Sequence, residues 1–143
     1  TESTRTKWDP VLSSTQLTCV GVVGVLAFAT LGLYMFYPPP NEILNEVTNI
    51  RAELYYAVKE GDLEETRRRS AQWELQVEKL PTSLLIRTGA VSDSQKDSVD
   101  EVLYGLRTLE RTLMQGKQKE AQILIDYVES LHRNCRKQFL DSQ

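Results

Sequence analysis

Apolar residues follow two different patterns along this chain. The first is an uncharged run from Pro10 to Asn41, whose mostly apolar centre is Leu17–Tyr37. A helix needs about 20 such residues to cross the hydrocarbon core of a bilayer. After the run, apolar residues recur every three or four positions, which is the spacing of one face of an α-helix. The chain is therefore predicted to be all-α, with one transmembrane helix followed by a helical domain.

The predicted span sets the order of the segments. They are a tail at residues 1–16, the span at 17–37, a proline-rich junction at 38–41, the helical domain at 42–140 and a tail at 141–143. A cleaved signal peptide has a shorter apolar region that ends in small residues. Here the run ends in aromatic residues and three prolines, Pro38–Pro40, so we interpret it as a retained anchor.

Four apolar stripes predict four helices in the domain. The first helix covers about residues 41–60 and ends at Gly61, with Asp62 capping the next, and the second covers about 63–80 and ends at Pro81. The third covers about residues 94–115 and the fourth about 117–140. The stripes are Leu44, Val47, Ile50, Leu54 and Ala57; Leu63, Thr66, Ser70, Trp73, Val77 and Leu80; Val99, Val102, Leu106, Leu109 and Leu113; and Ala121, Leu124, Val128, Leu131, Cys135 and either Gln138 or Phe139. Helices of similar length with mostly tight connections favour an antiparallel up-down-up-down four-helix bundle.

Two groups of residues are candidates for contact with a partner. Gly21, Gly24 and Ala27 recur every three residues in the span and form a smooth strip that another helix could approach closely. The alternative is that glycine is simply common in membrane helices. Leu84, Leu85 and Ile86 lie in a long predicted connection from Pro81 to about Asp93, where they either contact a partner or cover the domain's own core.

Charge next to the span predicts its orientation. Arg5 and Lys7 precede the span, whereas only Arg51 follows it at a comparable distance. Because positive residues favour the cytoplasmic side, the N-terminus is predicted to be cytoplasmic and the domain periplasmic, or on an equivalent external or lumenal side. Trp8, Tyr34 and Tyr37 suit the headgroup level at the two ends of the span.

Composition excludes several classes of function. The formal net charge is -3, unlike the strongly basic balance of a nucleic-acid-binding protein. The basic run Arg67–Arg69 follows two glutamates and is interpreted as a solvated helix face with ion pairs. The single histidine, His132, excludes a multi-histidine metal site within this chain. Cys19 and Cys135 are not expected to form a disulfide, and no catalytic arrangement is present, so we expect a non-enzymatic protein with no metal.

The last helix resembles that of one protein superfamily. Its start, Gly116-Lys117-Gln118-Lys119-Glu120-Ala121-Gln122, is similar to the start of the last helix in the cytochrome c-prime and soluble b-type cytochrome superfamily. The resemblance implies a periplasmic four-helix bundle. In c-prime members this helix ends in C-x-x-C-H-x-x-[FY], in which two cysteines attach haem and the histidine ligates iron.

The matching stretch of this chain departs from that motif. His132 stands at the first cysteine, Cys135 keeps the second, Arg136 replaces the iron ligand and Phe139 keeps the aromatic residue. Arginine has no lone pair to offer iron, so the haem positions are degenerate and no cofactor is expected. A single thioether through Cys135 with His132 as ligand is one alternative. The other places Cys135 in the core stripe and His132 at the edge of the bundle.

These features predict a membrane-anchored accessory or scaffold subunit of a larger complex, with a respiratory or photosynthetic assembly as a plausible host by analogy of fold. Its expected partners are integral membrane subunits and the lipid bilayer. One alternative is a haem-binding electron carrier or gas sensor with an altered c-prime-like site. Another is a tethered sensor or chaperone that binds a ligand between its helices.

Overall fold

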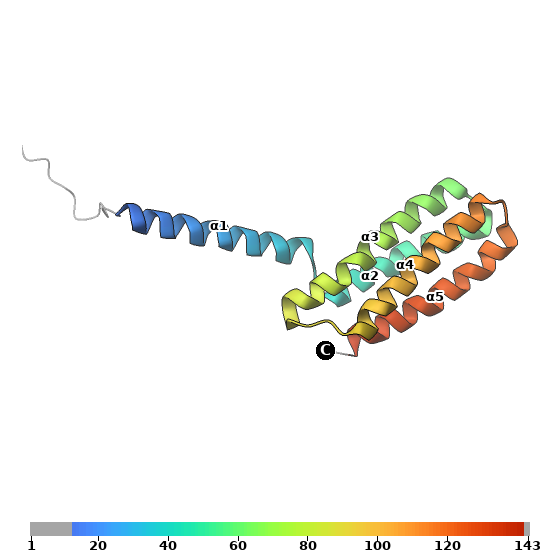
Figure 1. The fold of residues 1–143 in the computed structure, drawn as a ribbon. Coiled ribbons are helices and arrows are strands. Elements are labelled where there is room, and N and C mark those ends of the chain that lie inside the picture. Colours follow the sequence, from blue (N-terminus) through green and yellow to red (C-terminus); the bar gives the residue numbers. More distant parts are fainter. Residues whose placement is uncertain (1–12, 142–143) are drawn as a thin grey trace, which may run out of the picture. The chain divides into compact units, whose positions relative to one another are not determined.

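The computed structural model describes residues 13–141, and all regular structure in that range is α-helical (Figure 1). The helices are α1 (Ser14–Phe36), α2 (Pro40–Glu60), α3 (Leu63–Thr88), α4 (Asp93–Met114) and α5 (Gln118–Leu140). They form two separate units, one containing α1 and the other beginning at Tyr37. Arg5, Lys7 and Trp8, on which the predicted orientation partly depends, lie outside the described residues.

Helix α1 coincides with the predicted span. It begins three residues earlier than predicted, at Ser14, and ends one residue earlier, at Phe36. Its 23 residues include no charged side chain, and none of them is buried. At 1.5 Å per residue the helix is about 34 Å long, which matches a hydrocarbon core of about 30 Å. The hydroxyls of Thr18 and Thr30 donate hydrogen bonds to backbone carbonyls one turn earlier, so they add no unsatisfied donor. Helix α1 is therefore long and apolar enough to cross a membrane once.

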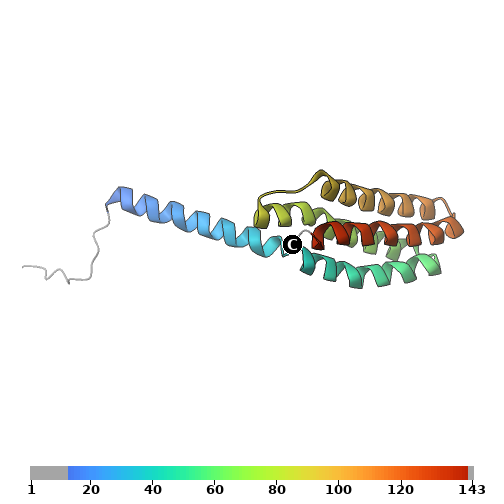
Figure 2. The same cartoon turned by 90° about the horizontal axis from the view of Figure 1, so that it is seen from below.

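Helices α2 to α5 pack around one hydrophobic core (Figures 1 and 2). Helix α2 packs against α3, α3 against α4, α4 against α5, and α5 against α2. Each helix thus has two neighbours, and α3 and α5 lie opposite each other across the core. The fully buried side chains include Leu44, Val47, Leu54, Trp73, Val77, Leu80, Val102, Leu106, Leu109, Ile125, Val128 and Phe139.

Local signals define the helix ends. Gly61 ends α2 with a positive φ of 70°, which costs glycine little because it has no Cβ. The side chain of Asp62 then accepts a hydrogen bond from the backbone N–H of Glu65 and caps α3, as predicted. Ser92 and Gln95 form a reciprocal capping box at the start of α4.

The predicted end of the second helix at Pro81 is wrong. Helix α3 continues through Pro81 to Thr88, so the segment predicted to be a long connection is mostly helical, and only residues 89–92 join α3 to α4. Leu80 and Leu84 are both buried, so the apolar stripe extends past the proline. Proline has no backbone N–H, so the helix lacks one hydrogen bond at Pro81. The burial of these two leucines offsets the free energy lost with that bond. Gly89, with φ 78°, ends the helix instead.

The apolar stripe predicted for α5 is slightly rotated from the buried face. Ile125 and His132 are fully buried, whereas Leu124 and Leu131 are only partly buried beside the core. The buried positions 121, 125, 128, 132, 135 and 139 follow the 3.6-residue period of a straight helix. The predicted stripe followed a 3.5-residue period, which drifts around a straight helix.

Candidate functional site

The degenerate haem positions lie on two faces of α5. His132 and Cys135 are fully buried in the core, whereas Arg136 is exposed. The expectation that His132 lies at the edge of the domain is wrong. Its imidazole meets the Trp73 indole edge-on, with ring centroids 5.4 Å apart and an interplanar angle of 88°. Cys135 does occupy the core stripe, as one of the two alternatives predicted.

The environment of His132 keeps its imidazole neutral. Burial lowers the pKa of His132 to about 4, and the positive charges of Arg51 and Arg136 act in the same direction. Arg51 is itself paired with Glu129, with Nε and Oε1 3.6 Å apart. Both imidazole nitrogens lack a hydrogen-bond partner among the described residues. A neutral imidazole is the form that such a site tolerates, because an unpaired buried charge costs far more than an unpaired buried dipole.

Two further polar groups in the core are unpaired. The Ser70 hydroxyl and the Trp73 indole N–H also lack a hydrogen-bond partner within the described part of the chain. Together with His132, these residues place polar atoms without hydrogen-bond partners among the described residues at three fully buried positions of the core, which is unusual in a folded protein.

Cys135 is not poised for nucleophilic or redox chemistry. Burial raises the pKa of its thiol to about 11, although contact with the Ser98 hydroxyl acts in the opposite direction. The thiol is therefore protonated at neutral pH, whereas reactive cysteines are thiolates in electropositive, partly exposed surroundings.

These residues do not fit a c-type haem. The iron-ligand position is an exposed arginine, and the imidazole of His132 is covered by the Trp73 ring. Both His132 and Trp73 are fully buried, so haem bound to His132 would require the packed core to open. Within residues 13–141, no three or more His, Cys, Asp or Glu side chains are grouped so that they could hold a metal ion.

The predicted contact strip on α1 is open. Gly21, Gly24 and Ala27 are exposed, and a Cβ on either glycine would meet no other described atom within 4 Å. Beside them lies a shallow groove of about 360 Å³, lined by Thr18, Gly21, Val22, Val25 and Leu26. The strip therefore leaves room for another helix to approach.

The three predicted contact residues in α3 differ in exposure. Leu84 is buried in the core, so its prediction as a partner contact is wrong. Its burial instead agrees with the alternative that this segment covers the domain's own core. Leu85 is 51% exposed, and Ile86 is half-buried. Only these two of the three can contact another molecule.

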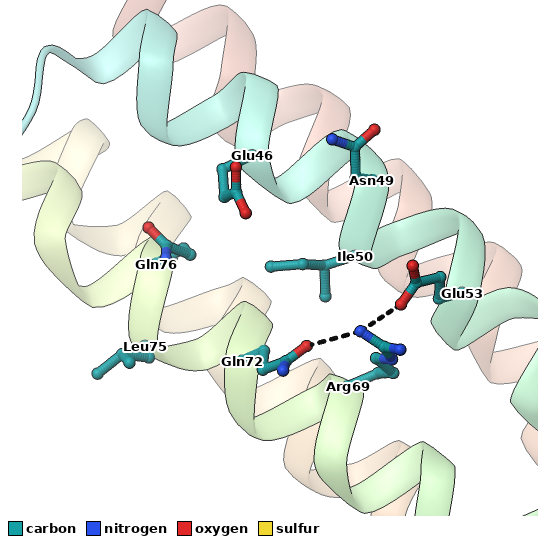
Figure 3. Close-up of a pocket in the computed structure, with 8 residues that line it drawn as sticks. All are labelled: Glu46, Asn49, Ile50, Glu53, Arg69, Gln72, Leu75 and Gln76. Atoms are coloured by element: carbon teal, nitrogen blue, oxygen red, sulfur yellow. Dashed lines mark hydrogen bonds and ion pairs between the residues drawn. The ribbon is translucent and has the colours of Figure 1, made fainter.

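A cleft between α2 and α3 was not predicted (Figure 3). It has a volume of about 270 Å³ and is lined by Glu46, Asn49, Ile50, Glu53, Arg69, Gln72, Leu75 and Gln76. Arg69 is paired with Glu53 and Glu65 and also donates to the Gln72 side-chain oxygen at 3.1 Å. The cleft is mostly polar and offers amide and carboxylate groups for hydrogen bonding. The residues of the cleft lie beside the apolar stripes of α2 and α3. They come together only because the two helices pack side by side.

The predicted ion pairs of the basic run are confirmed. Arg68 and Arg69 pair with Glu65 on the same helix, and the hydrogen bonds from both lower the pKa of the Glu65 carboxyl. Arg67 donates to Glu110 of α4 at 2.9 Å. The run is thus an ion-paired surface between helices and not an open basic patch.

No protein family model, curated protein or solved structure matches this chain significantly. The relationship to the cytochrome c-prime superfamily therefore stays a prediction from the residues of the last helix.

Proposed function

We propose that this protein is a non-enzymatic, single-pass, membrane-anchored accessory subunit of a larger membrane complex. In this proposal α1 crosses the bilayer, and α2 to α5 form an antiparallel up-down-up-down four-helix bundle on the external, periplasmic or lumenal side. The observation that carries it is α1 itself, a helix of 23 residues without a charge and without one buried side chain. Such a surface is stable in lipid or against another apolar helix, but not in water.

The strip on α1 supports a role in assembly beyond anchoring. Side chains at Gly21, Gly24 and Ala27 are small enough to let another helix pack closely, and close packing is a main source of helix association in membranes. The domain supports the non-enzymatic part of the proposal, because the haem positions do not fit the cofactor and Cys135 is protonated. An energy-converting membrane assembly is a host that suits the resemblance to c-prime proteins, by analogy of fold.

Two alanine substitutions in α1 test the docking role. Ala27 lies on the strip, whereas Ala29 lies about 200° around the helix from Ala27, outside the strip. Ala27→Leu and Ala29→Leu make the same chemical change and both keep the span apolar. Full-length protein carrying each change would be extracted from native membranes in mild detergent and analysed by native electrophoresis and identification of companion proteins.

The proposal expects wild type and Ala29→Leu to migrate in a defined complex with integral membrane proteins, and expects Ala27→Leu to lose most of that complex. Migration of the wild-type chain as a free monomer at native expression would overturn the accessory-subunit function. Equal assembly of both variants would remove the strip from the interface.

A further inference from the structure

The segment from Lys79 to Ser92 differs in charge from the rest of the chain. The protein has 20 acidic residues, yet this segment contains none, while it contains Lys79 and Arg87. It comprises the last turns of α3 and the connection to α4. A net positive, partly apolar segment in an acidic protein suits the phosphate and upper acyl region of a bilayer.

The fold places this segment at the end of the domain where the chain enters it. The Ser83 hydroxyl donates a hydrogen bond to the carbonyl of Pro38, two residues before α2 begins. Helix α3 runs past this point to Thr88, five residues further, which is about 7.5 Å of helix. The last turns of α3 therefore extend beyond the start of α2. We call this end, with residues 85–91, the entry end of the domain (Figures 1 and 2).

The entry end has exposed apolar groups. Leu85 is 51% exposed, Ala90 is exposed, and Ile86 and Val91 are half-buried. Beside them is an open hollow of about 280 Å³, lined by Leu84, Thr88, Ala90, Ser92 and Gln95. Gln95 also donates to the Gln138 carbonyl at 3.0 Å, which holds the end of α5 at the same end of the domain.

Chain continuity identifies the occupant of this surface. Tyr37, the first residue of the domain unit, directly follows Phe36, the last residue of α1. The opposite end of the domain, at Gly61 and Gly116, is about 30 Å away along α2. If α1 crosses a bilayer, the domain begins at the residue that follows the span, so the entry end is the end of the domain nearest to that bilayer along the chain.

We propose that the entry end docks onto the lipid headgroup region, with Leu85 and Ala90 reaching the interface between headgroups and acyl chains. This inference rests on the proposed membrane anchoring by α1. A protein partner for the same residues is the competing outcome of the test below.

The test uses the full chain in phosphatidylcholine and phosphatidylglycerol vesicles with a nitroxide quencher on the lipid headgroups. An environment-sensitive fluorophore is attached at Ala90→Cys, or at Gln115→Cys in the connection at the opposite end, in a Cys19→Ala, Cys135→Ala background. Circular dichroism confirms that each labelled chain keeps its helix content. We expect the label at position 90 to lose most of its fluorescence, and the label at position 115 to lose little.

A matched pair of charge variants checks that the entry end itself binds. Leu85 and Leu75 are both on α3 and similarly exposed, at 51% and 55%. Leu85→Glu should reduce the quenching at position 90, because it adds a carboxylate facing the lipid phosphates, whereas Leu75→Glu should leave it unchanged.

The outcomes separate this inference from the proposed function. A chain that does not float with the vesicles overturns the anchoring and the inference together. A chain that floats, but whose labels at positions 90 and 115 are quenched equally, overturns lipid docking alone. The label at position 90 could instead stay unquenched in vesicles but be shielded from an aqueous quencher in native membranes. That result would overturn lipid docking in favour of a protein partner.

Discussion

The imidazole of His132 on α5 and the indole of Trp73 on α3 meet edge-on across the core, with ring centroids 5.4 Å apart. Their helices lie on opposite sides of the domain, so this contact spans the space between the two other helices. Edge-to-face contact is a favoured geometry for aromatic rings. Here it places the only histidine of the chain where it cannot easily take up a proton.

We therefore expect the stability of the domain to depend on pH through His132. Its pKa falls from 6.5 to about 4 on folding, so between these values the unfolded state binds more protons than the folded state. The free energy of unfolding is therefore unaffected by His132 protonation above pH 6.5. It decreases by about 3 kcal/mol as pH falls from 6.5 to 4. The measurement is denaturant unfolding of the full chain in mild detergent, followed by near-ultraviolet circular dichroism between pH 4 and 8.

The control for this prediction is His132→Leu, which should be at least as stable as wild type at pH 7 and should lose the pH-dependent component. It also removes two buried nitrogens that have no hydrogen-bond partner among residues 13–141. An unchanged loss of stability at low pH in His132→Leu would assign the effect to carboxylates whose pKa is lowered in the folded state, such as Glu65, which accepts hydrogen bonds from Arg68 and Arg69.

Pro81 should be a site where substitution stabilises the protein. It lies inside α3 and cannot donate a backbone hydrogen bond, so Pro81→Ala restores one without changing a fully buried side chain. We expect a gain of about 1–2 kcal/mol in the free energy of unfolding, after allowing for the greater freedom of the unfolded chain. Thermal unfolding followed by far-ultraviolet circular dichroism measures it. A loss of stability would mean that α3 is broken at residue 81.

Pro81 also explains why the end of the second helix was predicted wrongly from the sequence. The apolar stripes of α2 and α4 could be predicted from regular spacing, and Gly61 and Asp62 marked the boundary between α2 and α3. At Pro81 the tendency of proline to end a helix conflicted with an apolar stripe that continues to Leu84. The helix continues because Leu84 is buried in the core. The continuing stripe and Gly89 were the signals that could have corrected it.

The candidate site was less predictable than the fold. His132 was placed at the edge because a leucine beside it, Leu131, fits an apolar stripe better by residue type. Its burial becomes evident only when the 3.6-residue period is followed from Ala121 to Phe139. The cleft between α2 and α3 depends on the distance between two packed helices, for which the sequence carries no direct signal.

Cys135 should be unreactive in the folded protein. A maleimide reacts with thiolate, and this thiol is buried with a pKa of about 11. In a Cys19→Ala background we expect labelling only at the rate of unfolding. Asn134→Cys, one residue away and exposed, serves as the positive control and should label within the mixing time. Rapid labelling of Cys135 without denaturant would show that α5 opens readily.

Gly105 should be intolerant of large side chains because it lies where α4 and α5 approach closely. A Cβ at this position would be 3.1 Å from both Leu131 Cδ1 and Val128 Cγ2. We expect Gly105→Leu to lower the free energy of unfolding by about 1–3 kcal/mol through overpacking. Tyr104→Leu, at an exposed neighbouring position, should have little effect. Denaturant unfolding compares the two, and equal effects would place the close contact elsewhere.

Membrane integration of α1 is tested most directly by alkaline carbonate extraction of membranes containing the full chain. We expect the protein to stay in the membrane pellet and to float with lipid in a density gradient. Val25→Lys combined with Leu26→Lys should release it, because two lysines near the middle of the span raise the insertion free energy by about 5–7 kcal/mol. Recovery of the unaltered chain in the carbonate supernatant would contradict the account.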